Sequence, residues 1–366
     1  MKSRSQKGTG MFAAKIDMAK AYDCVEWHFI EGVMVRMGFD RRWVDLIMNC
    51  VSTVSYSVLV NGHQSEAFIP TRGLRQGDPL SPYLFLLCAE GLLAITKAAV
   101  RDKRMHGLKP AQGALTVSHL FFADDSVFFG RATEQESGLL KQILQLYEKE
   151  SGKLVNFQKS AVSFSGNVRM HQKLMVSGTL QMTMVEKHEK YLGLPTVVGR
   201  SKKEIFNGLK DRIRKKLKEW KEKTLSVAGR ETLIRSVAQD QLTFAMSIFR
   251  IPAAIINKVH SLIMNFYWGQ KGSEKRIQWL SREEMLLPKE EGGLGLRDLE
   301  GFNTAMLAKQ VWRLHQRPSS LVAKIMKAKY YKNTSILEGN IGYRPTSSDE
   351  ASVAPMNSSA TASGGE

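Results

Sequence analysis

The sequence predicts an α+β protein, with a small antiparallel sheet packed against helices in the first part of the chain and helices in the rest. Three observations support this prediction. Short apolar runs are separated by turn residues before residue 165, longer helical stretches lie between those runs, and helical spacing with Lys and Arg on the free faces begins beyond Gly199. The chain has 366 residues, 43% of them hydrophobic, which is ample for a sizeable core.

The first helices are predicted from spacing and capping. Apolar residues recur at every fourth position from Val25 to Met37, which predicts an amphipathic helix ending at Gly38. Asp40 is the expected N-cap of a second helix that runs through Cys50.

A hairpin and a long helix follow. Asn61-Gly62 is the strongest short-range hairpin signal, and the flanking runs 55–60 and 66–69 are its expected strands. Ser81-Pro82 sets an N-cap residue before a helix-starting proline, which predicts a helix to Val100.

The next segment contains a pair of aspartates between two strands. The β-rich runs 116–122 and 126–129 flank Ala123-Asp124-Asp125, so these aspartates are expected in a tight turn. Thr133 and Glu136 form a capping box that opens a helix, and Gly152 ends it. A short strand over 162–164 is expected to follow.

The charge of the chain points to a polyanionic partner. The formal net charge is +18 and the pI is near 9.7, which favours nucleic acid or an anionic membrane surface, with a generic basic surface as the alternative. Between Lys202 and Lys223, ten basic residues stand against four acidic ones, a net charge of +6 on one helical stretch.

The cysteine and hydropathy patterns predict an intracellular protein. Cys24, Cys50 and Cys88 are widely spaced and match no metal-binding pattern, so we expect reduced, buried thiols. The longest apolar run, 83–95, is interrupted by Glu90 and is shorter than the roughly 20 residues of a membrane span. No apolar signal region begins the chain. We expect a nuclear or cytoplasmic protein, neither secreted nor inserted in a membrane.

Three carboxylates suggest chemistry. Asp17 ends the apolar run 11–16, and Asp124 and Asp125 sit at the strand-to-strand turn, so all three are expected on rigid sheet edges. Two carboxylates about 4 Å apart repel by roughly 4 kcal/mol at an effective dielectric near 20, and a divalent cation relieves this. Oxygen ligands alone favour Mg²⁺. The alternative is a structural turn, because Asp favours turns anyway.

Five ordered segments resemble the polymerase motifs of reverse transcriptases. These are residues 15–23 (KIDMAKAYD, motif A), 73–82 (GLRQGDPLSP, motif B), 121–125 (FFADD, motif C), 151–159 (SGKLVNFQK, motif D) and 191–195 (YLGLP, motif E). The form of motif B and the Trp/Gly-rich stretch after residue 265 resemble non-LTR (LINE-like) retrotransposons of the plant type. The resemblance covers most of residues 11–331.

The resemblance implies a right-hand polymerase fold. Its small antiparallel sheet with helices is the palm, followed by a helical thumb and a helical C-terminal extension. The implied ranges are a remnant before the palm (1–16), the palm with motifs A to E (17–198), the basic thumb (199–265), the Trp/Gly-rich extension (266–343) and a disordered tail (344–366).

The resemblance also implies the site residues. The metal carboxylates are Asp17, Asp124 and Asp125, with two Mg²⁺ ions, or Mn²⁺ in their place. Tyr22 matches the steric gate that excludes a ribose 2′-hydroxyl, and Gln76 and Gly77 match the residues beside the incoming nucleotide. Arg75 matches a residue that contacts a template phosphate, and Lys159 matches the motif D lysine near the leaving pyrophosphate. The cations that would contact the backbone of a duplex are Arg212, Lys215, Lys216 and Lys218. Each has a plainer alternative, namely a core aromatic, an ordinary loop or solvated cations.

The implied function is RNA-directed DNA synthesis. The partners would be an RNA template, a DNA primer and deoxynucleoside triphosphates. Phe122 replaces the tyrosine that is usual in motif C, which is expected to do little harm. Residues 1–10 cannot supply a fingers domain, so we expect a copy whose fingers and endonuclease portions are lost or lie on another chain. The alternative is a catalytically inactive retroelement relic that at most binds nucleic acid.

Overall fold

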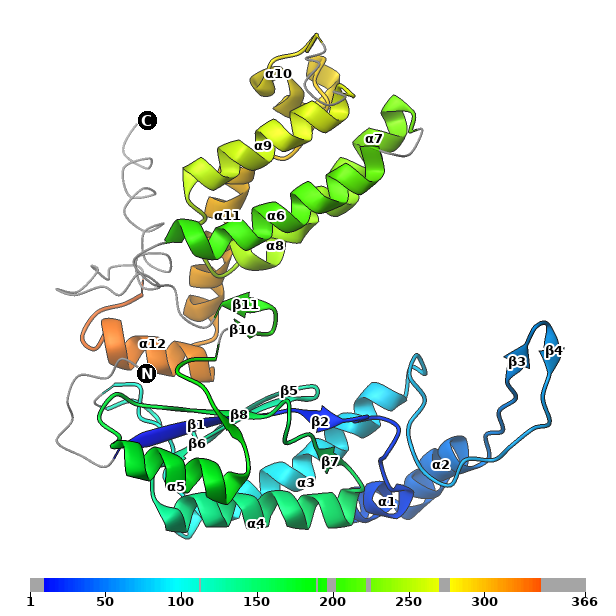
Figure 1. The fold of residues 1–366 in the computed structure, drawn as a ribbon, viewed down its shortest axis with the longest axis vertical. Coiled ribbons are helices and arrows are strands. Elements are labelled where there is room, and N and C mark those ends of the chain that lie inside the picture. Colours follow the sequence, from blue (N-terminus) through cyan, green and yellow to red (C-terminus); the bar gives the residue numbers. More distant parts are fainter. Residues whose placement is uncertain are drawn as a thin grey trace. The chain divides into compact units, whose positions relative to one another are not determined.

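The computed structural model describes residues 10–111, 113–188, 190–195, 202–221, 225–269 and 277–336. The chain divides into two compact units, one formed by Met1–Pro110 and Leu115–His188, the other by Ala111–Ala114 and Glu189–Glu366. Each unit is described by itself (Figure 1). The expected disordered tail 344–366 lies outside the described residues, as do residues 1–9 of the expected remnant.

A five-stranded sheet in the order β5-β6-β1-β8-β9 forms the centre of the first unit. Its strands are β1 (Met11–Ile16), β5 (His119–Phe122), β6 (Asp125–Arg131), β8 (Ala161–Phe164) and β9 (Thr183–Met184). β1 pairs antiparallel with both β6 and β8, while β9 joins β8 in parallel at the edge. The α+β fold with a small, mainly antiparallel sheet is therefore confirmed.

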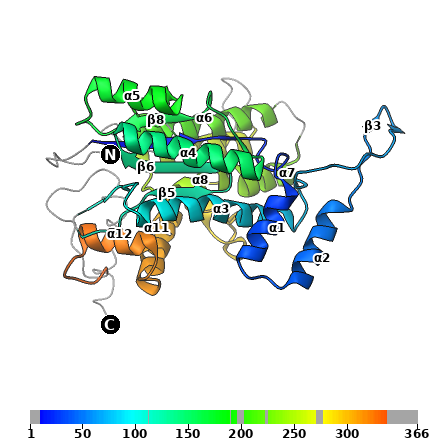
Figure 2. The same cartoon turned by 90° about the horizontal axis from the view of Figure 1, so that it is seen from below.

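Helices cover one face of this sheet. They are α3 (Ser81–Arg101), α4 (Glu134–Ser151) and α5 (Met170–Leu180), which lie together on the same side in two perpendicular views (Figures 1 and 2). Alternate residues of a strand point to opposite faces, and Phe12, Ala14 and Ile16 are fully buried in the core cluster. The other face of β1 presents Ala13 and Lys15.

The first two helices are α1 (Trp27–Arg36) and α2 (Arg41–Ser52). The predicted cap is confirmed, since Asp40 Oδ1 accepts a hydrogen bond from the Arg42 N–H at 2.9 Å. The predicted apolar series is only partly buried, because Val25 is fully buried and Phe29 packs against the core whereas Met37 is 50% exposed. The buried residues of α1 are Ile30 and Met34, because the helix begins only after Val25.

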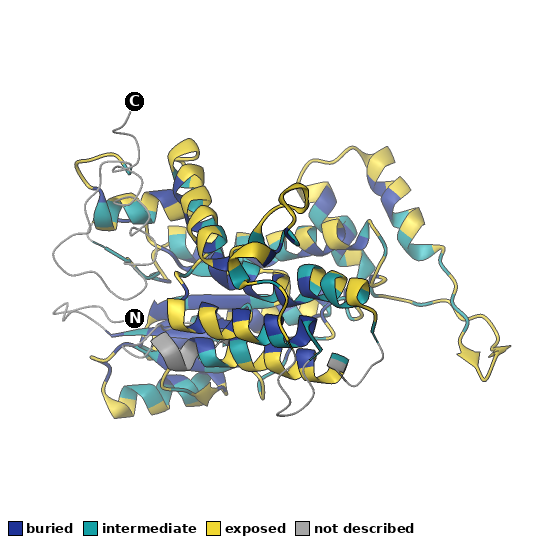
Figure 3. Ribbon diagram, turned by 90° about the horizontal axis from the view of Figure 1, so that it is seen from above, coloured by how far each residue is buried: buried dark blue, intermediate teal, exposed yellow. Residues whose placement is uncertain are grey.

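The predicted hairpin is present. β3 (Leu59–Val60) pairs with β4 (His63–Gln64) across Asn61-Gly62, and both turn residues have positive φ angles. The return strand β4 is closer to the turn than the predicted run 66–69, in which a single bridge, Tyr56 to Phe68, is formed. Figure 3 shows this hairpin extending from the unit with its residues exposed.

The start of α3 differs from the prediction. Ser81 is the first helical residue and not the cap, with Pro82 in the first turn. The N-cap is Leu80, which makes no side-chain capping bond, and the Asp78 carboxylate accepts from the Leu80 N–H at 2.7 Å in the turn ahead of the helix. α3 is 21 residues long and apolar enough to match a membrane span by length and composition. Its buried residues, among them Leu84 and Leu92, belong to the core of the first unit.

The three cysteines are free thiols, but they are not all buried. Cys88 is buried in α3, Cys24 is half-buried and Cys50 is exposed near the end of α2. The expectation of three buried thiols was therefore wrong for Cys50, which lies on the outer face of an amphipathic helix.

Glu136 connects three segments at the start of α4. Thr133 accepts from the Glu136 N–H at 3.3 Å, as the predicted capping box requires. The Glu136 carboxylate does not return to Thr133. Instead it accepts from the Arg131 N–H (2.9 Å) and the His106 N–H (3.0 Å), and lies 2.8 Å from His106 Nδ1. A buried carboxylate thus joins the end of β6 and the segment after α3 to α4.

We expect Glu136→Ala to destabilise the chain by about 3 kcal/mol, because each part-buried donor left without an acceptor costs about 1–3 kcal/mol. Denaturant unfolding measures this. Glu134→Ala is the matched control, since Glu134 is exposed in the same helical turn. Equal unfolding midpoints for the two variants would contradict the role of Glu136.

The second unit is mainly helical. Its helices are α6 (Lys202–Lys221), α7 (Val227–Leu233) with a π-helical turn (Ile234–Ala238), α8 (Asp240–Met246), α9 (Ala253–Tyr267), α10 (Arg282–Leu286), α11 (Leu299–Gln316) and α12 (Leu321–Tyr330), and its two-stranded sheet is β10 (Lys190–Tyr191) with β11 (Leu194–Pro195). One core cluster includes Phe206 and Ile263 together with Leu299. The expected thumb range 199–265 and extension range 266–343 therefore share a core, and the motif E hairpin belongs to this unit.

Candidate active site

The three candidate aspartates lie at one end of the β1–β6 pair. Asp17 directly follows β1, and Asp125 begins β6. The last register pair is Ile16 with Ser126, and Asp17 and Asp125 are the residues next to this pair along the chain. Asp125 Oδ1 lies 3.0 Å from Lys15 Nζ, so Asp125 is on the face of β1 that presents Lys15, away from fully buried Ile16. The two-residue alternation of a strand predicts the same face for Asp17.

The tight turn that carries Asp124 is confirmed. Phe122 pairs with Asp125 and closes the β5–β6 hairpin, which leaves Ala123 and Asp124 as its two turn residues. Ala123 has a φ of 49°, a left-handed conformation that an alanine adopts at a cost. Asp124 is exposed at the tip. The hairpin thus holds two acidic residues beside the end of β1.

Motif D and the serine that follows it anchor the backbone of Asp17. The Asp17 N–H donates to Ser160 Oγ at 3.1 Å, and the Asp17 carbonyl accepts from the Asn156 N–H at 2.8 Å. Next to it, β2 (Met18–Ala19) pairs with β7 (Leu154–Val155). Lys159, in the same loop, is exposed. The main chain of Asp17 is therefore fixed, and its side chain remains free to bind.

Lys15 supplies a positive charge at this edge. Its Nζ lies 3.0 Å from Asp125 Oδ1, and both side chains are about a quarter exposed. Among the residues that the structure describes, no three acidic, histidine or cysteine side chains gather into a preformed metal site. The donor set of Asp17, Asp124 and Asp125 nevertheless consists of hard carboxylate oxygens, which suit Mg²⁺ completed by substrate phosphates. An ion bound at Asp125 would either use Oδ2 beside the Lys15 pair or replace Lys15 at Oδ1.

Tyr22 contacts both helix α3 and the backbone of motif B. The Tyr22 ring stacks on Phe85 of α3, with ring centroids 4.6 Å apart and planes 13° apart. The Tyr22 carbonyl accepts from the Leu74 N–H at 2.8 Å. Gly73, whose φ is 94°, lies where a Cβ would approach the Asp23 carbonyl oxygen to 2.7 Å, so no other residue fits there.

The remaining motif B residues are placed in an open loop. Arg75, Gln76 and Gly77 are all exposed ahead of α3, and Gly77 has a φ of 92°. The Arg75 guanidinium lies 5.9 Å from the Tyr56 ring centroid. These three residues are available to a ligand.

The sequence interpretation missed Lys153. This motif D lysine is 2% exposed, and its Nζ lies 3.5 Å from the Phe85 ring centroid and 5.9 Å from that of Tyr147. Burial lowers the pKa of Lys153 to about 8, and nearby Cys88 acts in the opposite direction. Burial also raises the pKa of Cys88 to about 11 and raises that of Tyr147. Both neighbours are therefore neutral near pH 7.

Lys153 makes stability depend on pH. Its folded pKa of about 8 lies below the ordinary value of 10.5, so the unfolded chain binds more protons between these values and unfolding free energy rises with pH there. Below about pH 8 the cost of the buried charge is fully present. Each pKa unit between the ordinary and the folded value corresponds to about 1.4 kcal/mol, and loss of the cation–π contacts offsets about 1 kcal/mol of the gain. Lys153→Met should therefore raise the free energy of unfolding by about 2 kcal/mol at pH 7.

Urea unfolding at pH 7 and pH 10 measures this, with Lys149→Met as the control because Lys149 is exposed on α4. The Lys153→Met variant should show a smaller rise in unfolding free energy with pH than the unmodified chain. Identical pH profiles in the two proteins would show that Lys153 is not buried in its charged form.

The basic face of the second unit is confirmed as exposed. Arg212, Lys215, Lys216 and Lys218 of α6 are all exposed, whereas Ile213 and Leu217 are buried in the unit's core. α6 thus presents a row of cations to solvent.

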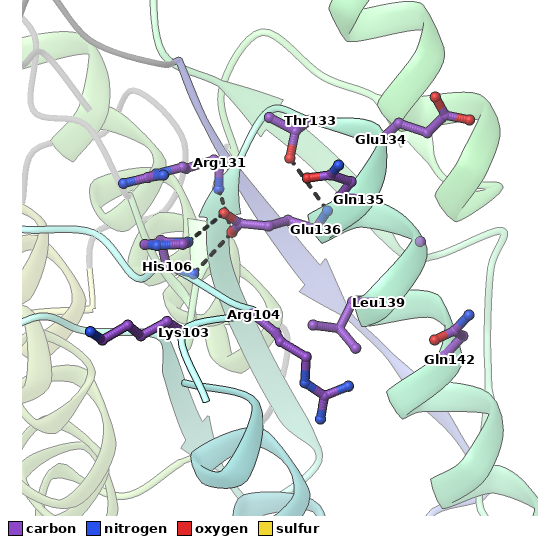
Figure 4. A pocket seen from close by; sticks show the side chains of 11 residues that line it. Lys103, Arg104, His106, Arg131, Thr133, Glu134, Gln135, Glu136, Leu139 and Gln142 are labelled. Atoms are coloured by element: carbon purple, nitrogen blue, oxygen red, sulfur yellow. Dashed lines mark hydrogen bonds and ion pairs between the residues drawn. The ribbon is translucent and has the colours of Figure 1, made fainter. Parts of the chain in front are cut away.

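A concave surface of the first unit lies elsewhere. It encloses about 720 Å³ and is lined by Lys103, Arg104 and residues of the α4 start around Glu136 (Figure 4). Arg131, which lines it, ends β6, whereas Asp125 begins that strand, so roughly 20 Å of strand separates the two. The pocket is therefore distinct from the end of the sheet that carries the three aspartates. The candidate active site is assigned from the register of the strands and not from the pocket.

A small antiparallel sheet backed by helices, with aspartates at the meeting ends of its central strands, is the arrangement expected of a polymerase palm. The reverse transcriptase (RNA-dependent DNA polymerase) family matches residues 2–196, and the chain belongs to this family. This confirms the resemblance to reverse transcriptases of non-LTR retrotransposons that the motifs predicted.

Three relatives illustrate the match. A ribonuclease H protein of Arabidopsis thaliana is 33% identical over 38% of this chain and 22% of its own length. The transposon TX1 149 kDa protein of Xenopus laevis is 23% identical over 79% and 21%. The Pol polyprotein of the type-2 retrotransposable element R2DM of Drosophila melanogaster is 25% identical over 79% and 27%. The chain thus spans about a quarter or less of these three relatives.

Proposed function

We propose that this chain is the polymerase core of a non-LTR retrotransposon reverse transcriptase, which adds deoxynucleotides to a primer 3′ end along an RNA template. The register of β1 and β6 supports this most, because it brings the end of β1, which Asp17 follows, to the start of β6 at Asp125, with Asp124 in the adjoining turn. Family membership supports the same reaction.

The residues divide the work as follows. Asp17, Asp124 and Asp125 would hold two Mg²⁺ ions, which can activate the primer 3′-hydroxyl and stabilise the leaving pyrophosphate. The primer 3′-hydroxyl would give its proton to water, its oxygen would attack the α-phosphorus to form a P–O bond, and the bond to the leaving pyrophosphate would break. Lys159 is exposed next to the Asn156 turn and is placed to give pyrophosphate a proton.

The nucleotide and the nucleic acid would meet other residues of the chain. Gln76 and Gly77 lie in the open motif B loop, where a backbone without Cβ permits close approach of the nucleotide. Arg75 in the same loop would contact a template phosphate, and Tyr22 would close against a ribose 2′-hydroxyl. The exposed cations of α6 would bind the duplex backbone without sequence preference. Three free thiols suit work inside the cell, in nucleus or cytoplasm.

Primer extension by the unmodified chain on an RNA template tests the proposal. Extension that requires Mg²⁺ or Mn²⁺ and disappears in the Asp124→Asn, Asp125→Asn double variant supports it. Extension that survives in the double variant contradicts the assignment of the carboxylates. Binding of primer and template without extension under any divalent ion supports the alternative, an inactive relic that binds nucleic acid.

A further inference from the structure

Three side chains, one each from motif A, helix α3 and motif D, form one stack that includes Tyr22, the predicted gate residue. Lys153 Nζ lies 3.5 Å from the Phe85 ring centroid, and the Tyr22 ring stacks on Phe85 at 4.6 Å. An ammonium at 3.5 Å must lie over a ring face, because an approach in the ring plane would overlap its carbon atoms. An ammonium over the middle of that face would crowd a ring stacked there with a centroid separation of 4.6 Å. We infer that Tyr22 and Lys153 occupy opposite faces of Phe85, and we call these three residues the gate stack.

The backbone fixes both ends of the gate stack. Motif B holds Tyr22 through the bond from the Leu74 N–H to the Tyr22 carbonyl at 2.8 Å. The Lys153 N–H donates to Ser151 Oγ at 3.2 Å, and the Ser151 carbonyl accepts from the Glu26 N–H at 2.9 Å. These hydrogen bonds link the backbone around Lys153 to the segment that follows Tyr22.

A charged lysine at this buried position lowers the free energy of unfolding. No ion pair involving Lys153 occurs among the described residues, and the titratable groups beside it, Cys88 and Tyr147, are neutral near pH 7. An uncompensated buried ammonium costs more than an apolar side chain of the same length would. A positioning role for its charge would explain why a lysine stands here.

The charge has a specific effect on ring stacking. Two parallel aromatic rings repel through their electron-rich faces, so an offset or edge-to-face arrangement is normally favoured. A cation over one face of Phe85 draws electron density towards itself and makes the other face a better partner for the electron-rich phenol of Tyr22. Lys153 therefore favours the near-parallel stack, whose interplanar angle is 13°.

We propose that Lys153 is a positioning residue for sugar selection, which holds the Tyr22 ring, through Phe85, in the orientation that excludes a ribose 2′-hydroxyl. This inference rests on the proposed role of Tyr22 as the steric gate. Without the cation the Tyr22 ring samples other orientations, and a ribonucleotide gains access to the site. The primer-extension step itself does not involve Lys153, so deoxynucleotide use is largely retained.

The first experiment measures the ratio of ribonucleotide to deoxynucleotide incorporation by the full chain. Lys153→Met should raise this ratio about fivefold, as expected for the loss of a cation–π contact of ordinary strength. Tyr22→Val should raise it further, and adding Lys153→Met to Tyr22→Val should change it no more. Lys149→Met, an exposed lysine of α4, is the matched control. A merely structural role would lower incorporation of both nucleotides equally.

The second experiment does not depend on catalysis. A single 4-fluorophenylalanine replaces Phe85, and its ¹⁹F resonance is followed from pH 7 to pH 10, where Cys88 and Tyr147 stay largely neutral. The resonance should move with a midpoint near the Lys153 pKa of about 8 and should not move in Lys153→Met. Tyr22→Val should also shift it, because the stacked ring is removed.

The outcomes separate the inference from the proposed function. If Tyr22→Val leaves the ratio unchanged, or no extension occurs at all, the gate function fails, while the ¹⁹F titration still decides whether Lys153 supports the stack. If Tyr22→Val relaxes selection and Lys153→Met does not, the inference is wrong. A ¹⁹F resonance that titrates equally with and without Lys153 overturns it as well.

Discussion

Asp17→Asn is expected to lower the rate of primer extension by about a thousandfold or more. A metal-bound carboxylate contributes several kcal/mol of charge stabilisation in the transition state, and each 1.4 kcal/mol is tenfold in rate. Asparagine keeps the size of the side chain but removes the anionic oxygen. The two hydrogen bonds that anchor Asp17 involve its main chain, so they survive the change. Single-turnover extension measures the effect.

Stability should change little in this variant. Asp17 is half-buried at a strand end, and loss of one of three neighbouring negative charges does not strain the fold. Asp45→Asn serves as the control, because Asp45 is exposed on α2. Equal loss of extension in both variants, or a fully active Asp17→Asn chain, would remove Asp17 from the reaction.

The second large effect is expected in nucleic-acid binding. Reversing the charges of Lys215, Lys216 and Lys218 to Glu should weaken primer–template binding by at least about a hundredfold at low salt and reduce the salt dependence by about one slope unit for each lost phosphate contact. These three side chains are exposed on α6, so the change leaves the buried face of the helix intact. Fluorescence anisotropy over a series of salt concentrations measures both quantities.

The matched control reverses three exposed lysines of the same unit, Lys309, Lys324 and Lys327 of α11 and α12. Both variants change the net charge by the same amount, so a general electrostatic effect would weaken binding equally. Binding that falls only in the α6 variant supports the thumb assignment. A flat salt response in the unmodified chain would contradict phosphate binding altogether.

Much of the palm could be predicted because its signals are local. Asn61-Gly62 specifies a hairpin turn by its backbone conformation, and Gly152 ends α4 with a φ of 73°. The position of Asp17 at a strand end could be read from the apolar run before it. The pairing partner of that strand could not be derived from spacing alone, because register depends on contacts more than 100 residues apart in the chain.

The errors arose where tertiary contacts override a local pattern. The residues that α1 buries are Ile30 and Met34, because the helix starts later than the spacing suggested. The Glu136 carboxylate does not complete the predicted capping box, because it accepts hydrogen bonds from two backbone N–H groups outside its helix. Lys153 could not be singled out, because a lysine beside a helix-ending glycine is usually solvated and only the packing of α3 against α4 buries it.

Binding of Mn²⁺ in the presence of primer, template and a deoxynucleoside triphosphate tests the central claim most directly, since the claim is that Asp17, Asp124 and Asp125 together hold the divalent ions. Electron paramagnetic resonance of the free ion gives the number bound by all components, and the same mixture without the chain gives the part held by nucleic acid and nucleotide, so the difference is the number bound through the chain. We predict two bound Mn²⁺ ions for the unmodified chain, fewer for Asp17→Asn and for the Asp124→Asn, Asp125→Asn variant, and no change for Asp45→Asn. Equal occupancy in all four proteins would contradict the claim, because the ions would then be held by the nucleotide alone.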